Sequence, residues 1–301
     1  MLRTSFQYIL FILILIFDTE VSCNAKDLKI QDRNLINSFF GKLYNFSFDE
    51  ADSLVLVMTE SGIDDATLDN IRANLAWWKL LSGEAIESNI DSCDFYLEQS
   101  LKSNSGKQID LNSLFNTIFA YSLKSRLENY RGNSLKSLLL FNKSLSYIEK
   151  CVDLPVKDDR LNLVLGLYYY FIDYFKDEYF MVSALFFPFH GGDKVKGLQY
   201  LEEGSQSKDE LVRTEASYFL LKIYTSTEKD YFKALTNAQI LTRNHPGNLV
   251  YSIEQLKLML ILKPHAEVEI FQKKLLNEIH LAENISRIQK DHFINQIEHI
   301  K

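Results

Sequence analysis

The feature that most constrains this chain is the helical spacing of its apolar residues over long stretches without chain breakers. Only 4 prolines and 11 glycines interrupt 301 residues, which is sparse for a β protein that needs frequent turns. Apolar residues at i, i+3 and i+7 form one face of an amphipathic helix. Three such stripes stand out: Leu68, Ile71, Leu75 and Trp78; Leu135, Leu138, Leu145 and Ile148; and Val212, Ala216, Phe219, Leu220 and Ile223. The sequence therefore predicts an all-α fold.

Break signals recur fairly regularly and leave segments of roughly 15 to 25 residues, as expected for helical hairpins stacked on one another. Length and amphipathicity predict helices near 65–82, 84–103, 110–130 and 134–152. Residues 265–301 alternate apolar and charged side chains and are expected to form C-terminal capping helices.

Several hairpins carry a motif in which small residues stand where two helices would approach closely. The motif residues are Leu165, Gly166 and Tyr169 for a first helix; Gly197, Leu201 and Gly204 for a second helix; and Tyr224, Tyr231, Ala234 and Ala238, closed by Pro246. Small residues let paired helices approach while large ones fill the next groove. In this pattern most of residues 30–262 resemble a divergent tetratricopeptide-repeat protein, and we expect residues 26–301 to form one such domain.

The resemblance implies a right-handed solenoid of five to six helical hairpins plus the capping helices. It also implies a non-enzymatic scaffold that binds a protein or peptide, with no cofactor. A glycan-binding or small-ligand-binding envelope lipoprotein built on the same repeats is the alternative.

The N-terminus has the layout of a secretory signal, which we place at residues 1–25. Arg3 precedes the apolar run Ile9–Phe17, which is too short to span a bilayer comfortably, and small and polar residues follow. Val21-Ser22-Cys23 resembles a lipoprotein box, although Glu20 stands where an apolar residue is expected. Cleavage near Ala25 and lipidation of Cys23 both remain open. Either route predicts an exported protein in the periplasm or at the outer membrane.

The net charge of the chain argues against a nucleic-acid partner, and its cysteines raise the question of a disulfide. The net charge is -7 and no basic run exists, so we expect no nucleic-acid partner and membrane contact only through an N-terminal lipid. Cys93 and Cys151 remain after signal removal. We favour two buried thiols over a disulfide, because pairing does not follow from sequence.

The stretch Phe186–Leu198, FFPFHGGDKVKGL, interrupts the hairpin motif. Tyr169 and Gly197 are 28 residues apart, where the family has nine, so an aromatic insertion is expected over 174–192. In one interpretation the first helix is prolonged, its aromatic residues are core, and Asp193 caps the second helix. In the other, the insertion lines a binding groove, with Phe186, Phe187, Phe189, His190 and Asp193 as binding residues.

Catalytic motifs are weak. His190-Gly191-Gly192 resembles the oxyanion loop of some lipases, but no G-x-S-x-G elbow accompanies it, so a hydrolase is a remote alternative. No H-E-x-x-H or C-x-x-C occurs, so we predict neither catalytic residues nor a metal site.

Replacing Phe186, Phe187 and Phe189 together by serine tests the insertion. If these rings bind the partner, the variant should keep its helicity and melting temperature and lose binding in a pull-down. Unchanged fold and binding would contradict the binding role, and early melting would make the rings core.

Overall fold

A computed structural model describes residues 30–105, 110–154, 157–178 and 185–300, and every regular element in these ranges is an α-helix. The predicted all-α fold is therefore confirmed for this part of the chain. The signal segment 1–25 with Cys23, and the middle of the aromatic insertion, lie outside the described residues. The helices are α2 (Ile30–Tyr44), α3 (Phe48–Ser61), α4 (Asp65–Leu81), α5 (Ile86–Asn104), α6 (Leu111–Tyr130), α7 (Ser134–Glu149), α8 (Asp159–Glu178), α10 (Lys194–Gly204), α11 (Glu210–Ser226), α12 (Tyr231–Asn244), α13 (Leu249–Leu262), α14 (His265–Leu281) and α15 (Arg287–Glu298).

Local capping explains where several helices begin and end. Asp64 accepts a hydrogen bond from the backbone N–H of Thr67 at 3.1 Å and caps α4. Asp110 and Ser113 form a reciprocal capping box at the start of α6. Gly62 ends α3 with a φ of 79°, a left-handed conformation that glycine adopts without strain. The helices α4, α5, α6 and α7 lie close to the four positions predicted between residues 65 and 152.

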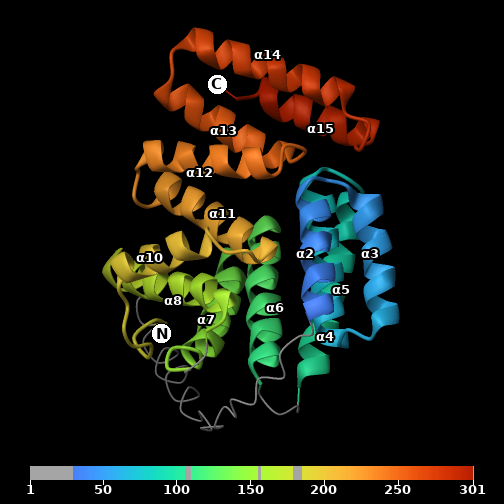
Figure 1. The fold of residues 1–301 in the computed structure, drawn as a ribbon. Helices are drawn as coiled ribbons and strands as arrows, with labels where there is room; N and C mark the ends of the chain where they lie inside the picture. The colour runs from blue at the N-terminus through green and yellow to red at the C-terminus, as the bar shows by residue number, and fades with distance from the viewer. Residues whose placement is uncertain (1–29, 106–109, 155–156, 179–184, 301) are drawn as a thin grey trace, which may run out of the picture.

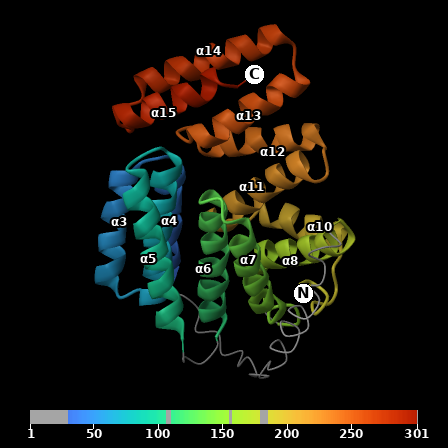
Figure 2. The same cartoon turned by 180° about the vertical axis from the view of Figure 1, so that it is seen from behind.

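The helices pack mainly as sequential pairs. The contacts join α2 with α3, α4 with α5, α6 with α7, α8 with α10, α11 with α12, and α13 with α14, and α15 then packs on α14. Figures 1 and 2 show the early hairpins α2–α5 on one side, α6–α10 on the other, and α12–α15 stacked across one end. The predicted capping region 265–301 thus holds α14 and α15.

The inner layer is formed by the first helix of each of five pairs. In this layer α2 contacts α4, α4 contacts α6, α8 contacts α11, and α11 contacts α2. The last of these contacts joins the first pair to the fifth, so the array curls back on itself. The first helices consequently surround a central space.

Polar contacts of very long sequence separation hold this closure. The Tyr44 hydroxyl donates to Glu215 Oε1 at 3.2 Å, and Asn248 Nδ2 donates to the Tyr44 carbonyl at 2.9 Å. Gln289 Nε2 donates to Ser82 Oγ at 2.7 Å. The turns that end the first helices of the first two pairs are therefore fastened to α11, α13 and α15.

The two glycines of the predicted motif pack α8 directly against α10. A Cβ atom on Gly197 would lie 2.5 Å from the backbone nitrogen of Tyr170, and one on Gly166 would lie 2.7 Å from Leu201 Cγ. Ala234 and Ala238 are fully buried in α12. Leu165, Tyr169 and Tyr224 are buried and Tyr231 is half-buried. The close approach of paired helices that the small residues predict is thus observed between α8 and α10.

Burial supports most of the predicted core, with one correction. The stripe from Leu68 to Trp78 is buried, and Trp77 beside it is buried too. Cys93 and Cys151 are free and buried in separate hydrophobic clusters, and burial raises the pKa of each thiol to about 12. Leu135, predicted as core, is instead exposed. It lies in the first turn of α7, and burial of the stripe increases along the helix, since Leu138 is half-buried while Leu145 and Ile148 are buried.

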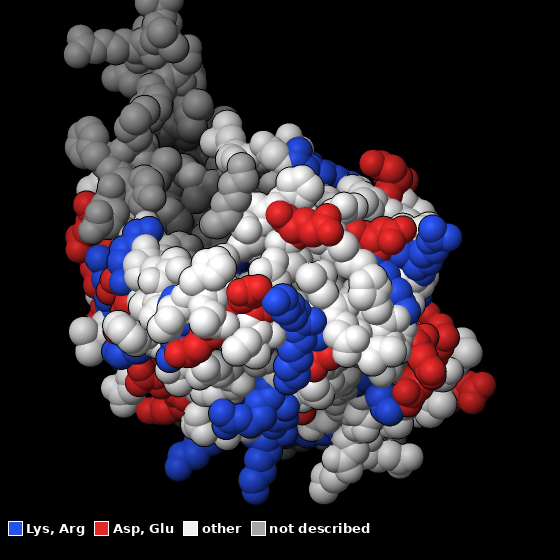
Figure 3. All heavy atoms as spheres, turned by 90° about the horizontal axis from the view of Figure 1, so that it is seen from above, with Lys and Arg blue, Asp and Glu red and all other residues white. Residues whose placement is uncertain are grey.

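At the end of the molecule that carries α14 and α15, the surface charges are not all of one sign. Acidic and basic side chains are interspersed there (Figure 3). None of the helices described is long and apolar enough to cross a membrane.

His245 is a buried histidine at the closure. Its Nε2 lies 2.8 Å from Thr214 Oγ1, and its Nδ1 lies 3.4 Å from Asn45 Nδ2. Because an amide nitrogen only donates, Nδ1 accepts and Nε2 carries the proton. Burial, followed by the charge of Arg213, lowers the pKa of His245 to about 4, although Glu210 Oε1 lies only 3.4 Å from Nε2. Protonation would set a new N–H against the Asn45 amide.

Gly197→Ala should destabilise the protein, because its methyl group would meet the backbone of α8. We expect a loss of about 1–3 kcal/mol in the free energy of unfolding, measured by urea denaturation. Gly41→Ala is the matched control, since nothing lies within 4 Å of a Cβ there and alanine favours a helix. Equal effects of the two substitutions would contradict the close approach of α8 and α10.

His245 should make stability depend on pH. Its folded pKa lies below the unfolded value of 6.5, so its contribution is complete above pH 6.5 and is lost as pH falls toward about 4. The loss should be on the order of 3 kcal/mol. His245→Gln should flatten this part of the pH profile of unfolding, whereas His280→Gln, at an exposed position, should not. If the pH dependence of unfolding were the same for the native protein and both variants, His245 would not be the residue responsible.

Candidate functional site

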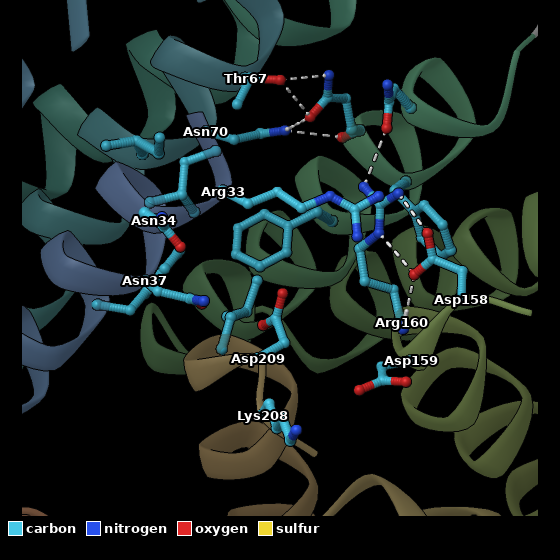
Figure 4. Close-up of a pocket in the computed structure, with 18 of the residues that line it drawn as sticks. Arg33, Asn34, Asn37, Thr67, Asn70, Asp158, Asp159, Arg160, Lys208 and Asp209 are labelled. Carbon is cyan, nitrogen blue, oxygen red and sulfur yellow. Dashed lines mark hydrogen bonds and ion pairs between the residues drawn. The ribbon is translucent and has the colours of Figure 1, made fainter. Parts of the chain in front are cut away.

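A cavity of about 380 Å³ lies among the inner helices. Its walls come from the first halves of α2, α4 and α6, from residues 157–160 before and at the start of α8, and from residues 208–211 at the start of α11 (Figure 4). The volume is within the range of small-ligand sites. The amino ends of α8 and α11 open onto it, so their partial positive charges face the cavity.

Asparagines dominate the polar wall. Each of the first three inner helices contributes a pair spaced by one helical turn: Asn34 and Asn37 from α2, Asn70 and Asn74 from α4, and Asn112 and Asn116 from α6. Because residues three or four apart lie on one helix face, each pair points the same way. The pairs thus place six side-chain amides in the lining of one cavity.

Part of this surface is fixed by bonds within the wall. Asn70 Nδ2 donates to the Asn116 carbonyl at 3.0 Å, and Asn116 Nδ2 donates to Thr67 Oγ1 at 2.9 Å. The bond from Nδ2 to a carbonyl sets the orientation of the Asn70 amide, because a flip would bring two oxygens together. These bonds hold α4 and α6 in register at the cavity.

Other amide atoms in the wall have no hydrogen-bond partner among the residues that the structure describes. Asn70 Oδ1 is buried and has no hydrogen-bond donor among the described residues. Asn37 Oδ1 accepts from the Glu210 N–H at 3.0 Å, whereas its Nδ2 finds no acceptor in the described ranges. A buried unpaired acceptor costs about 1–3 kcal/mol, so Asn70 Oδ1 favours a bound group that donates a hydrogen bond.

Arg160 forms the charged wall opposite α2. Its Nε and Nη2 donate to the two oxygens of Asp158 at 2.9 and 2.6 Å, and its Nη1 donates to Asn112 Oδ1 at 3.1 Å. Burial alone would raise the pKa of Asp158, but the hydrogen bonds and charge of Arg160, with Arg33, lower it. Arg33 reaches across the cavity from α2 toward this pair (Figure 4).

Two further aspartates shape the mouth. Asp209 caps α11 by accepting the Val212 N–H at 3.0 Å, and burial raises the pKa of its carboxyl. Asp159 accepts from Ser207 Oγ at 2.5 Å. The lining also holds the cations Arg33, Lys157, Arg160 and Lys208, so four basic side chains stand against three carboxylates and most of the charge is balanced.

A second cavity of about 80 Å³ lies between α6, α8 and α11. Its walls are mainly apolar, and its charged groups include Arg126 and Glu215. Arg126 Nη2 is 2.5 Å from Glu215 Oε2, and the guanidinium stands 4.7 Å from the centre of the Phe219 ring. The lining shared by both cavities is Asn74, Phe115, Phe119, Arg160 and Leu211, so the two adjoin.

The residues predicted for binding lie elsewhere. Phe186 is fully buried and stacks on Phe175 with ring centres 4.6 Å apart, and Phe189 is buried beside Tyr168. Phe187 is 71% exposed. None of them lines either cavity. Phe186 and Phe189 therefore follow the core interpretation of the insertion, and the binding role of the segment stays a prediction.

His190 and Asp193 complete that loop. The His190 side chain is 94% exposed, with Nδ1 3.7 Å from Glu149 Oε1, and its carbonyl accepts from the Tyr168 hydroxyl at 2.9 Å. Asp193 caps α10 by accepting the Lys196 N–H at 2.9 Å, as the prolonged-helix interpretation predicts. The loop is thereby fastened to α8.

The sequence did contain a signal for the cavity. The asparagine pairs begin at Asn34, Asn70 and Asn112, at intervals of 36 and 42 residues, each early in a first helix. Asparagine usually marks caps and turns, which hides such a pattern. No group of three potential metal ligands occurs within the described ranges. Comparisons with protein-family models, curated proteins and solved structures found no match to this chain.

Proposed function

We propose that this chain is an exported, non-enzymatic scaffold whose hairpins form a right-handed, tetratricopeptide-like solenoid and whose larger cavity receives an extended protein or peptide segment. The observation that carries the proposal is the amide wall built by asparagine pairs from α2, α4 and α6. A peptide backbone presents N–H donors and C=O acceptors in alternation, and amide side chains complement both.

An unpaired amide oxygen supports the same ligand. Asn70 Oδ1 is buried with no donor among the described residues, and the N–H of a bound peptide unit would supply one. The near balance of charge around Asp158, Arg160 and Asp209 suits an uncharged backbone. The supporting aromatic rings of Phe40, Phe115 and Phe119 give the segment apolar contact area.

A glycan or other small polar ligand is the second candidate. The observation in its favour is the combination of amide and carboxyl groups with phenylalanine rings in a cavity of about 380 Å³. Hydroxyl groups could use the same unpaired amide atoms.

Asn34→Trp tests the proposal by filling the cavity. Asn34 is exposed at the cavity wall and has no hydrogen bond in the described structure, so the fold should tolerate the change. A pool of capped pentapeptides would be incubated with the purified protein, and retained peptides identified by mass spectrometry. We expect the variant to retain at least about tenfold less peptide, equivalent to about 1.4 kcal/mol.

Asn277→Trp, at an exposed site on α14 away from the cavity, is the matched control and should bind like the native protein. Equal retention by the Asn34 variant would place binding outside the cavity. Enrichment from a panel of neutral oligosaccharides, with none from the peptides, would favour the second candidate.

A further inference from the structure

The second cavity adjoins the first and differs from it in chemistry. Its side walls include Leu163, Leu167 and Phe219, which belong to this cavity alone, together with Phe119 from the shared wall. Six asparagines line the larger cavity, whereas among the described residues that line the smaller one Asn74 alone carries a side-chain amide. A ligand lying along the amide wall would therefore have an apolar recess beside it.

The charges in the recess already have partners. Arg126 is paired with Glu215, which also accepts from the Tyr44 hydroxyl at 3.2 Å, and the guanidinium lies against Phe219. Arg160 is held by Asp158 and Asn112. A charged or strongly polar ligand group entering the recess would lose its hydration without gaining a partner, which is unfavourable.

The size of the recess limits what enters it. Its volume of about 80 Å³ is near half that of the ~150 Å³ apolar cavity that accepts benzene. An aromatic ring is therefore too large, whereas a branched aliphatic group of three or four carbons fits.

We propose that the recess is a specificity pocket for a short branched aliphatic side chain, valine, leucine or isoleucine, of the peptide bound in the larger cavity. The inference rests on the proposed function and adds the side-chain class that the site selects. The backbone lies on the asparagine wall, and the side chain passes Phe115 and Phe119 into the space beside Leu163.

A series of acetyl-Gly-X-Gly-amide peptides tests this pocket on the native full chain. With X as Gly, Ala, Val, Leu, Ile, Phe or Trp, dissociation constants would be measured by titration followed by NMR. We expect at least about tenfold tighter binding for Leu than for Ala, the discrimination that added methylenes give in a fitted pocket. Binding should weaken again for Phe and Trp.

Leu163→Ala is a variant that we expect to gain binding of a larger peptide side chain. It enlarges the recess without altering the larger cavity, since Leu163 lines only the recess. The preferred side chain should shift from Leu to Phe, a change that partial unfolding would not produce. Leu139→Ala, at an exposed position of α7, is the control and should keep the native order.

The outcomes separate the two proposals. If the Gly peptide binds and the Leu peptide binds no better, the pocket is refuted while peptide binding in the larger cavity stands. An unchanged preference in the Leu163 variant also overturns the pocket. If no peptide of the series binds, both proposals fail.

Discussion

The contact on which the rest of the structure depends is the buried polar cluster of Tyr44, Glu215 and Arg126. Glu215 is almost fully buried and is held by the Tyr44 hydroxyl and the Arg126 guanidinium. These residues come from α2, α11 and α6, so one carboxylate joins three inner helices that are distant in sequence. A buried charge is tolerated only with such partners, and losing one of them typically costs several kcal/mol. The cluster therefore selects the closed arrangement over an open one.

Closure creates the cavities. Because α2 returns to α11, Asn34 and Asn37 line the same cavity as Asp158 and Arg160 (Figure 4). Arg126 and Glu215 of this cluster also line the smaller cavity, where each is the other's ion-pair partner. The contact that joins the inner helices therefore also keeps the charges of the recess paired.

Much of the fold followed from local patterns. The helices between residues 65 and 152, the close approach of Gly166 and Gly197, and the buried thiols of Cys93 and Cys151 were all predictable, because periodicity and side-chain size act over short range. Leu135 was mispredicted, since an apolar stripe says which face is apolar but not where the neighbouring helix ends. The insertion shows the same limit: Phe186, Phe187 and Phe189 look equivalent in sequence, yet the loop backbone buries two and exposes one.

The sequence by itself determined the helices, their pairing and the small residues that let pairs approach, since each depends on neighbours a few turns apart. Only the tertiary structure decided that α2 meets α11, that three asparagine pairs share one wall, and that an apolar recess lies beside them. These features join residues that are far apart in the sequence, by 171 positions in the case of Tyr44 and Glu215. Their formation depends on the summed curvature of successive hairpins and on the Tyr44–Glu215 bond, and no local pattern encodes that sum.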